Sequence, residues 1–193
     1  MDYTAADLEY VQTNYVTLEQ LCDERAETPT EVRALIDAGR LPKPSYVLDD
    51  GTAMFPVDYF RFVDEAGGPA GLRERFEERF AATGGSDLDL HWEAYLEGTY
   101  GVCLWDVTPE TIARKAALVS SISELLMLAR PRQADWRRRL RAEVDELDAL
   151  ERQFTPDFDR DEERFGRKPT RDLLIDAARE RYPDVFAGDL AAR

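Results

Sequence analysis

The sequence predicts a mostly α-helical protein, in which an N-terminal module with one small β-hairpin packs on a C-terminal bundle of helices. Apolar side chains recur every three or four residues along most of the chain, which is the spacing of one helix face. Threonines followed by proline, glutamine or glutamate mark several helix starts. The break Gly67-Gly68-Pro69 separates the two parts. A chain of 193 residues suits one domain or two small ones, and we expect units at 1–66 and 67–193.

Threonine caps mark the helices in the first third of the chain. Thr4 can cap a helix that runs to about Tyr15. Thr17 forms a capping box with the glutamine three residues later, so a second helix follows it. Thr28 has proline at the next position and glutamate at the third, and it begins another helix that Gly39 ends. These patterns predict three short helices before residue 40.

A β-hairpin follows these helices. Ser45–Leu48 and Ala53–Phe55 are short segments suited to strands, and they flank Asp49-Asp50-Gly51. An Asp-Gly pair is typical of a tight hairpin turn. Pro56 suits the first position of a further helix, because a proline there loses no hydrogen bond. The hairpin and this helix complete the predicted N-terminal module.

The remaining two thirds of the chain show helical patterns separated by glycine and proline. The longest pattern begins at Thr108 and has an apolar arc wide enough for a helix in the centre of the domain. The segment from Gly98 to Asp106 interrupts the helical pattern. The expected helices are Pro69–Ala82, one capped by Ser86, Pro109–Ala129, one that begins at Asp135, and Leu173–Tyr182 after a cap at Thr170.

The order helix, turn, helix and hairpin is that of a winged helix-turn-helix, and residues 14–62 resemble the MerR and excisionase type. The resemblance rests on T-L-x-x-L in the first helix, V-R-x-L-I-D-A-G-R-L-P in the second and Y-V-L-D-D-G-T-x-M-F in the wing. In such proteins the second helix enters the major groove and the wing touches the DNA backbone. The resemblance implies a DNA-binding regulator whose candidate contacts are Thr30, Arg33, Arg40, Lys43 and Tyr46.

The charge of this module argues against DNA binding. The chain has 40 acidic and 25 basic residues, a net charge of −15. Residues 1–68 contain 14 acidic and five basic residues, a net charge of −9. Because affinity for nucleic acid depends on cationic contacts, this balance disfavours DNA as a partner. It favours a winged helix that docks a protein or a small molecule.

The stretch His91–Lys115 concentrates the rare side chains of the chain. It holds the single histidine, one of the two cysteines and two of the three tryptophans. Such a group can line a mostly apolar ligand pocket, or it can cap the end of a helical core. Gly98 and Gly101 favour an unusual backbone in this stretch. The candidate ligand-binding residues are His91, Trp92, Tyr95, Tyr100, Cys103, Trp105 and Asp106.

The sequence has no familiar catalytic or cofactor motif. It lacks G-x-S-x-G, G-x-G-x-x-G and P-loop patterns, so no cofactor is predicted. Cys103 and His91 could form a thiolate pair, although a free cysteine is commonly a small buried hydrophobe. No ligand spacing supports a metal site, and the acidic run at Asp157 lacks the glycine and the final glutamate of a calcium loop. The catalytic residues stay unassigned.

An arginine cluster begins the helix expected after Asp135. Cations at a helix N-terminus oppose the helix dipole, so this order is unusual. The cluster could dock an acidic partner, or it could be a solvated, ion-paired face. Its members are Arg137, Arg138, Arg139 and Arg141.

The composition also favours a cytoplasmic protein. No apolar run approaches the roughly 20 residues of a membrane span, and the acidic N-terminus lacks a signal pattern. The two cysteines lie far apart, without a C-x-x-C pair, which favours reduced thiols. We expect no membrane partner, and the sequence leaves a homodimer open.

Motifs along nearly the whole chain resemble a family of small proteins of high-GC bacteria that accompany genes of natural product biosynthesis. They are N-Y-V-T-L-E-Q-L-C, S-Y-V-L-D-D-G-T-x-M-F-P-x-D-Y-F, Y-L-x-G-x-Y-G-V-C-L-x-x-V-T-P-E and F-x-P-D-F-D-R with R-Y-P. The resemblance implies a role with a metabolite or a pathway protein. We therefore expect binding or conversion of a small molecule, with the winged-helix regulator as the alternative.

Overall fold

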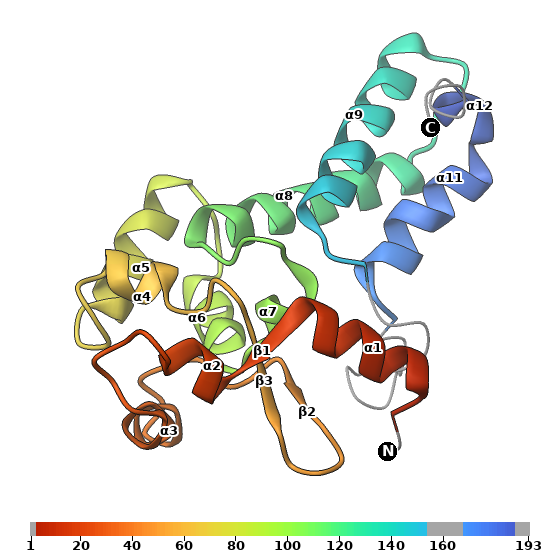
Figure 1. Ribbon diagram of the computed structural model, residues 1–193. Coiled ribbons are helices and arrows are strands. Elements are labelled where there is room, and N and C mark those ends of the chain that lie inside the picture. The colour runs from red at the N-terminus through yellow and green to blue at the C-terminus, as the bar shows by residue number, and fades with distance from the viewer. Residues whose placement is uncertain (1–2, 154–167, 188–193) are drawn as a thin grey trace.

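The computed structural model describes residues 3–153 and 168–187 and shows a mostly helical protein with one small antiparallel sheet (Figure 1). Helix α8, Pro109–Met127, lies between two groups of elements. One group contains α1 to α7 and the sheet, and the other contains α9, α11 and α12. This arrangement confirms the predicted fold class. In the parts of the chain that the structure describes, no helix has the length and apolar character needed to cross a membrane.

Three reciprocal capping boxes begin the N-terminal helices, as the sequence predicts. In each box the threonine hydroxyl accepts a bond from the N–H of the third helical residue, whose side chain accepts from the threonine N–H. Thr17 and Gln20 cap α2, and Thr28 and Glu31 cap α3. Thr4 caps α1 in the same way. The helices are α1 Ala5–Asn14, α2 Leu18–Cys22 and α3 Pro29–Asp37.

The sheet has three antiparallel strands in the order β1-β3-β2. Strands β2 (Tyr46–Val47) and β3 (Ala53–Pro56) form the predicted hairpin. Strand β1 (Tyr15–Thr17) pairs with β3 and was not predicted, because three residues between two helices are too few to show an alternating pattern. Pro56 ends β3, so the expectation that it begins a helix is wrong. A strand end tolerates the missing N–H of proline.

The helices between the sheet and α8 begin without side-chain caps. Asp87, and not Ser86 as expected, is the N-cap of α6, and the Ser86 hydroxyl instead donates to the Asp87 carboxylate at 2.8 Å. The stretch expected to interrupt the helical pattern contains the short helix α7. Gly98 precedes it with a left-handed φ of +74°. The bounds are Arg61–Glu65 for α4, Leu72–Ala82 for α5, Leu88–Leu96 for α6 and Thr99–Cys103 for α7.

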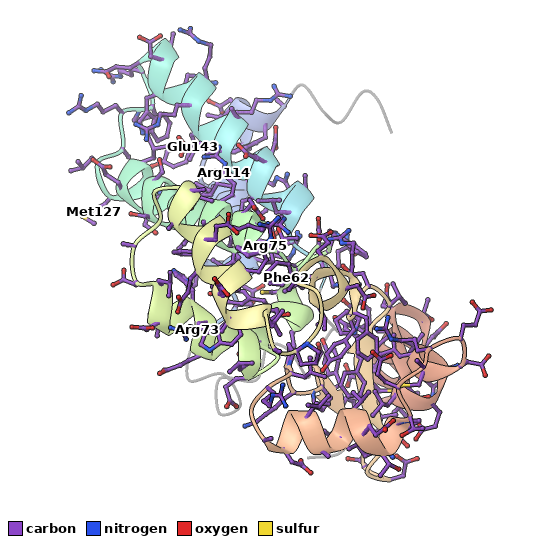
Figure 2. All side chains as sticks on the ribbon, turned by 90° about the vertical axis from the view of Figure 1, so that its left-hand side faces the viewer. Phe62, Arg73, Arg75, Arg114, Met127 and Glu143 are labelled. Carbon is purple, nitrogen blue, oxygen red and sulfur yellow. The ribbon has the colours of Figure 1, made fainter. Side chains whose placement is uncertain are left out.

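Helix α9, Ala134–Leu150, packs along the second half of α8. The indole N–H of Trp136 donates to the carbonyl of Leu125 at 3.1 Å, which satisfies the one polar atom of this buried ring. Arg114 of α8 pairs with Glu146 of α9, and Figure 2 shows Arg114 beside the α9 helix that carries Glu143. Thr108 caps α8, as predicted.

The segment after residue 168 differs from the single helix expected for Leu173–Tyr182. It forms three short elements, and Pro183 begins the last of them. The side chain of Thr170 makes no capping bond. The first element is a π-helix that places Arg171 in the interior, where it donates to Asp148 at 2.5 Å. The elements are η2 Arg171–Asp176, α11 Ala177–Arg181 and α12 Pro183–Phe186.

Two main hydrophobic cores lie along α8. The first core combines residues of the N-terminal module with residues of α4 to α7 and the start of α8. The second core lies between the rest of α8, α9 and the C-terminal elements. The cores therefore do not divide at residues 66 and 67, because side chains from both sides of this position share the first core. Its members include Leu18, Val32, Phe55, Phe62, Phe76, Tyr95 and Ile112.

Candidate functional site

The end of α5, the α5–α6 loop, α6 and α8 line an open pocket of about 270 Å³, which we call the His91 pocket. The loop contributes Gly84, Gly85 and Ser86, and α6 contributes His91. Helix α8 contributes small side chains at positions that share one helix face. None of the lining side chains is an acid, a lysine or an arginine. The α8 residues that line the pocket are Ala113, Ala116, Ala117 and Ser120.

His91 is positioned in the pocket by Tyr100 of α7. The Nδ1 atom of His91 and the hydroxyl oxygen of Tyr100 are 2.6 Å apart. Either the tyrosine hydroxyl donates to a neutral ring, or the ring donates to the hydroxyl oxygen. In both cases Nδ1 is engaged, and Nε2 is the ring nitrogen left for a ligand.

The environment of His91 favours its neutral form. Burial lowers the pKa of His91, and the nearby Asp87 carboxylate opposes this effect without reversing it. The pKa therefore lies below the ordinary value of about 6.5. At neutral pH the ring is uncharged, and it can donate or accept one hydrogen bond at Nε2.

This shift predicts how His91 titrates and how stability depends on pH. The unfolded chain binds a proton at His91 before the folded chain does, so folded stability falls as pH drops below about 6.5. Because His91 is the only histidine, its ring proton signals in an NMR spectrum of the folded protein identify it directly. A pH titration of these signals should give a midpoint below that of a histidine in a denatured control. An equal or higher midpoint would contradict the shift.

The loop at the mouth of the pocket has an unusual backbone. Asp87 has φ of 61°, and it is the non-glycine residue with a left-handed φ in the described ranges 3–153 and 168–187. Gly84 also has a left-handed φ, of +73°. A side chain on Gly85 would collide with the ring of Phe80, at 2.8 Å. Residues held in rare conformations cluster at binding sites, so the loop geometry supports the site.

Trp92 and Tyr95, also predicted as ligand contacts, lie in the first core. Their rings pack against Phe76, with centroid distances of 5.2 Å and 5.4 Å. The other side of Tyr95 lines a separate cavity of about 30 Å³, together with Gly98 and Gly101. That space holds about one water molecule. These two aromatic residues therefore support the core beside the His91 pocket.

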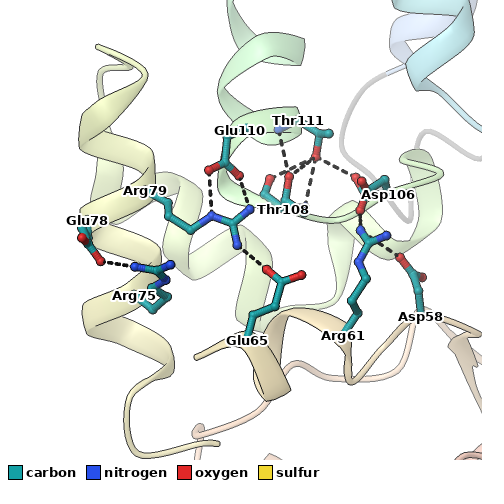
Figure 3. Close-up of polar contacts among 10 residues, drawn as sticks. All are labelled: Asp58, Arg61, Glu65, Arg75, Glu78, Arg79, Asp106, Thr108, Glu110 and Thr111. Carbon is teal, nitrogen blue, oxygen red and sulfur yellow. Dashed lines mark hydrogen bonds and ion pairs between the residues drawn. The ribbon is translucent and has the colours of Figure 1, made fainter. Parts of the chain in front are cut away.

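Trp105 and Asp106 lie away from the His91 pocket. The Trp105 ring is 48% exposed and packs under the guanidinium of Arg152, 4.7 Å from the ring centroid. Asp106 pairs with Arg61, which also approaches Asp58 (Figure 3). The seven predicted residues consequently do not enclose one pocket. Of the seven, His91 lines this pocket and Tyr100 is bonded to it.

A network of ion pairs centred on Arg79 joins α4 and α5 to α8. Arg79 of α5 donates to both carboxylate oxygens of Glu110, at 2.7 Å and 2.8 Å, and also pairs with Glu65 of α4 (Figure 3). The hydrogen bonds to Arg79 lower the pKa of the Glu110 carboxyl. Paired in this way, these groups fix the helices that support the pocket.

A buried polar cluster on α8 was missed in the sequence. The Nζ atom of Lys115 lies 2.8 Å from the carboxylate of Glu151, and the two residues are only 9% and 1% exposed. Burial alone would lower the pKa of Lys115. The Cys103 thiol and the Glu151 carboxylate outweigh burial, so the pKa of Lys115 is raised. A signal was present, because lysine is rare here: Lys115 is one of three lysines beside 22 arginines.

The winged-helix resemblance predicts five DNA contacts. In the structure, three of these side chains are buried or paired with other residues of the chain. Tyr46 is 1% exposed and packs against Tyr15 inside the sheet. Arg33 pairs with Glu19, and Lys43 pairs with Glu97 at 2.7 Å. Only Thr30 and Arg40 are exposed without such an ion pair. Among the described residues, Arg40 is therefore the one cation of these five that carries no ion pair.

The arginine cluster of α9 is ion-paired in the same manner. Arg138 pairs with Asp135, Arg139 with Glu143 and Arg141 with Asp145, while Arg137 approaches Asp184. This matches the solvated, ion-paired alternative for that face.

The described residues contain no group of three or more histidine, cysteine or carboxylate side chains that could hold a metal ion. The acidic run at Asp157 lies outside the described residues. The thiol of Cys103 points to the backbone carbonyls of Thr99 and Tyr100, at 3.7 Å and 3.8 Å. In the described residues the thiol is thus directed at its own helix, and the ring of His91 bonds to the Tyr100 hydroxyl and not to Cys103.

Comparison with known proteins gives one family. A model described as a family of unknown function (DUF6058) matches residues 61–183, which is more than half of the chain. The match begins close to the predicted boundary at residue 66 and includes the His91 pocket. No curated protein and no solved structure matches the chain.

Proposed function

The chain belongs to the DUF6058 family, whose function is unknown, and from the geometry of the site we propose that it binds a small, uncharged organic molecule in the His91 pocket. One observation carries this proposal: the only histidine of the chain is held by Tyr100 at an open pocket of about 270 Å³. Ligand pockets of drug-sized molecules begin at about 300 Å³, so the ligand is small.

The lining of the pocket defines the chemistry of the ligand. The alanines of α8 offer an apolar wall, and the hydroxyl of Ser120 and Nε2 of His91 offer hydrogen bonds. No formal charge lines the pocket, so an ionic ligand would lose part of its hydration without gaining a charged partner. An uncharged molecule with one apolar side and at least one hydrogen-bonding group fits these walls. His91 would also be the group that transfers a proton if the ligand is converted.

The biological setting rests on the sequence. The resemblance to natural-product-biosynthesis proteins supports a metabolite as the ligand, and the matched family carries no assigned role. Both cysteines are free and buried, which supports a reducing compartment such as the cytoplasm.

Filling the pocket should abolish binding without unfolding the protein. Ala117 is exposed on α8, so Ala117→Phe adds a ring to the pocket and leaves the core unchanged. We expect a library of uncharged aromatic and heteroaromatic fragments to shift the His91 ring signals of the wild type but not those of Ala117→Phe. Tyr100→Phe should weaken binding roughly three- to tenfold, because it frees the His91 ring from one hydrogen bond.

Trp105→Phe is the matched control, since it changes a predicted residue that lies outside the pocket and should leave binding unchanged. If the library shifts no His91 signal, or shifts it equally in Ala117→Phe, the His91 pocket is not a ligand site.

A further inference from the structure

Cys103, Lys115 and Glu151 form a buried cluster on the other side of α8 from the His91 pocket. Lys115 is one residue from Ala116, and at 100° per residue its side chain leaves the face that carries the pocket alanines. All three residues are less than 10% exposed. The proposed ligand site uses none of them.

Backbone pairing brings the three residues together. Leu104 and Glu151 form an antiparallel bridge, and the N–H of Arg152 donates to the Cys103 carbonyl at 2.9 Å. Glu151 then holds the Lys115 ammonium at 2.8 Å. The Cys103 thiol also interacts with this ammonium and, together with Glu151, raises the pKa of Lys115. Lys115 thus lies between a carboxylate and a thiol.

The buried contacts among Cys103, Lys115 and Glu151 are unusual for a purely structural cluster. A buried ion pair loses much of its Coulomb energy to desolvation and is weak evidence for stabilisation. Neither carboxylate oxygen of Glu151 accepts a hydrogen bond of good geometry in the described part of the chain. The neighbouring element, η2, is a π-helix, a form found frequently at functional sites.

We propose that Cys103 and Lys115 are a covalent modification site, where dioxygen links the sulfur to the lysine nitrogen through one oxygen atom. The S–H bond and two N–H bonds break, and Sγ–O and O–Nζ bonds form. Glu151 takes one proton, and the other two hydrogens leave with the second oxygen atom as water. Sulfur and nitrogen each lose two electrons, and dioxygen gains four.

The buried setting favours this product. Before the reaction, the interior holds an ammonium and a carboxylate, and both lose hydration there. After it, the interior holds a neutral bridge and a neutral carboxylic acid. Dioxygen is small and apolar, so it can reach a side chain that water-soluble reagents cannot. The bridge ties the end of α7, which carries Tyr100, to α8, which carries the pocket alanines.

The chain contains its own comparison residue. Cys22 is as buried as Cys103, at 7% against 8% exposure. The charged groups that act on Cys22 are arginines and glutamates, and no lysine is among them. Burial raises the pKa of the Cys22 thiol. A reaction that needs only a buried cysteine would affect both residues, whereas the proposed bridge affects only Cys103.

Peptide mass spectrometry of the full chain tests the bridge. The protein is kept under air-saturated buffer or under a thiol reductant, and then digested with trypsin without reduction. Trypsin cannot cut after a bridged Lys115, so residues 80–114 should appear joined to residues 115–132. The joined mass should show one added oxygen and two lost hydrogens, and a thiol reductant should separate the peptides.

Lys115→Arg keeps the charge and Cys103→Ser keeps a polar atom, and both should lose the joined peptide, while Cys22→Ser should retain it. Circular dichroism checks that each variant is folded. Recovery of the two peptides only as separate species after prolonged aeration would overturn the proposal. Oxygen added to Cys103 alone, without loss of hydrogens from Lys115, would overturn it as well. Neither outcome depends on the His91 pocket.

Discussion

Replacing Lys115 with methionine should lower the free energy of unfolding by about 3–5 kcal/mol, because it leaves the Glu151 carboxylate buried without its partner. Methionine fills a similar volume, so the loss reports the uncompensated charge and not a cavity. Urea unfolding at neutral pH, under a thiol reductant, measures the change. Adding Glu151→Leu to Lys115→Met should recover most of the loss, since a buried apolar pair is often as stable as a buried ion pair.

An exposed pair provides the control for this experiment. Lys43 and Glu97 are 2.7 Å apart, and both side chains are more than half exposed. Lys43→Met should therefore cost less than about 1 kcal/mol. Equal losses at Lys43 and Lys115 would show that burial does not set the cost.

The pH dependence of the Lys115 contribution follows from the direction of its shift. The raised pKa means that the folded state holds this proton more tightly than the unfolded state. Its contribution is fully present below the ordinary lysine pKa of about 10.4, and it is lost only as pH rises beyond that value. At neutral pH the pair is intact.

Replacing Gly98 with alanine should destabilise the protein by about 2–5 kcal/mol through two separate effects. Gly98 has a left-handed φ of +74°, which costs an alanine about 1–2 kcal/mol. The added Cβ would also lie 2.5 Å from the carbonyl oxygen of Lys43 and 2.9 Å from that of Pro44. These are backbone atoms that cannot rotate away, and such overpacking costs typically 1–3 kcal/mol.

Gly67→Ala separates the two effects. Gly67 has φ of +73°, but no atom lies within 4 Å of a Cβ at that position. It should therefore show the conformational cost alone, and the difference in urea midpoint between the two variants measures the collision. If the urea midpoint of Gly98→Ala is no lower than that of Gly67→Ala, a Cβ at position 98 does not collide with the backbone of Lys43 and Pro44.

Local sequence signals predicted much of this fold. Threonine caps at Thr17, Thr28 and Thr108 were correct, because a capping box depends on residues only three positions apart. Strand β1 was missed, since its pairing with β3 joins residues about 40 positions apart and leaves no local pattern. The cap at Ser86 failed because Asp87 adopts a left-handed backbone, which aspartate tolerates better than most residues but which a capping pattern does not reveal.

The candidate site was only partly visible in the sequence. His91 stood out because it is the single histidine, and its partner Tyr100 lies one irregular turn later. The alanines of α8 carry no chemical signal, so the pocket wall could not be predicted. Trp92 and Tyr95 were predicted as contacts because aromatic residues suit pockets and cores equally well. Only their packing against Phe76 distinguishes the two cases.

The first core joins the family region of this chain to the residues that precede it. The family match starts at residue 61, yet the core that contains Phe62 and Phe76 is completed by Leu18, Val32 and Phe55 from before that point. A gene fragment that began at the match would encode helices with an apolar side open to water. In this chain the DUF6058 region therefore depends on the segment before residue 61 to cover that side.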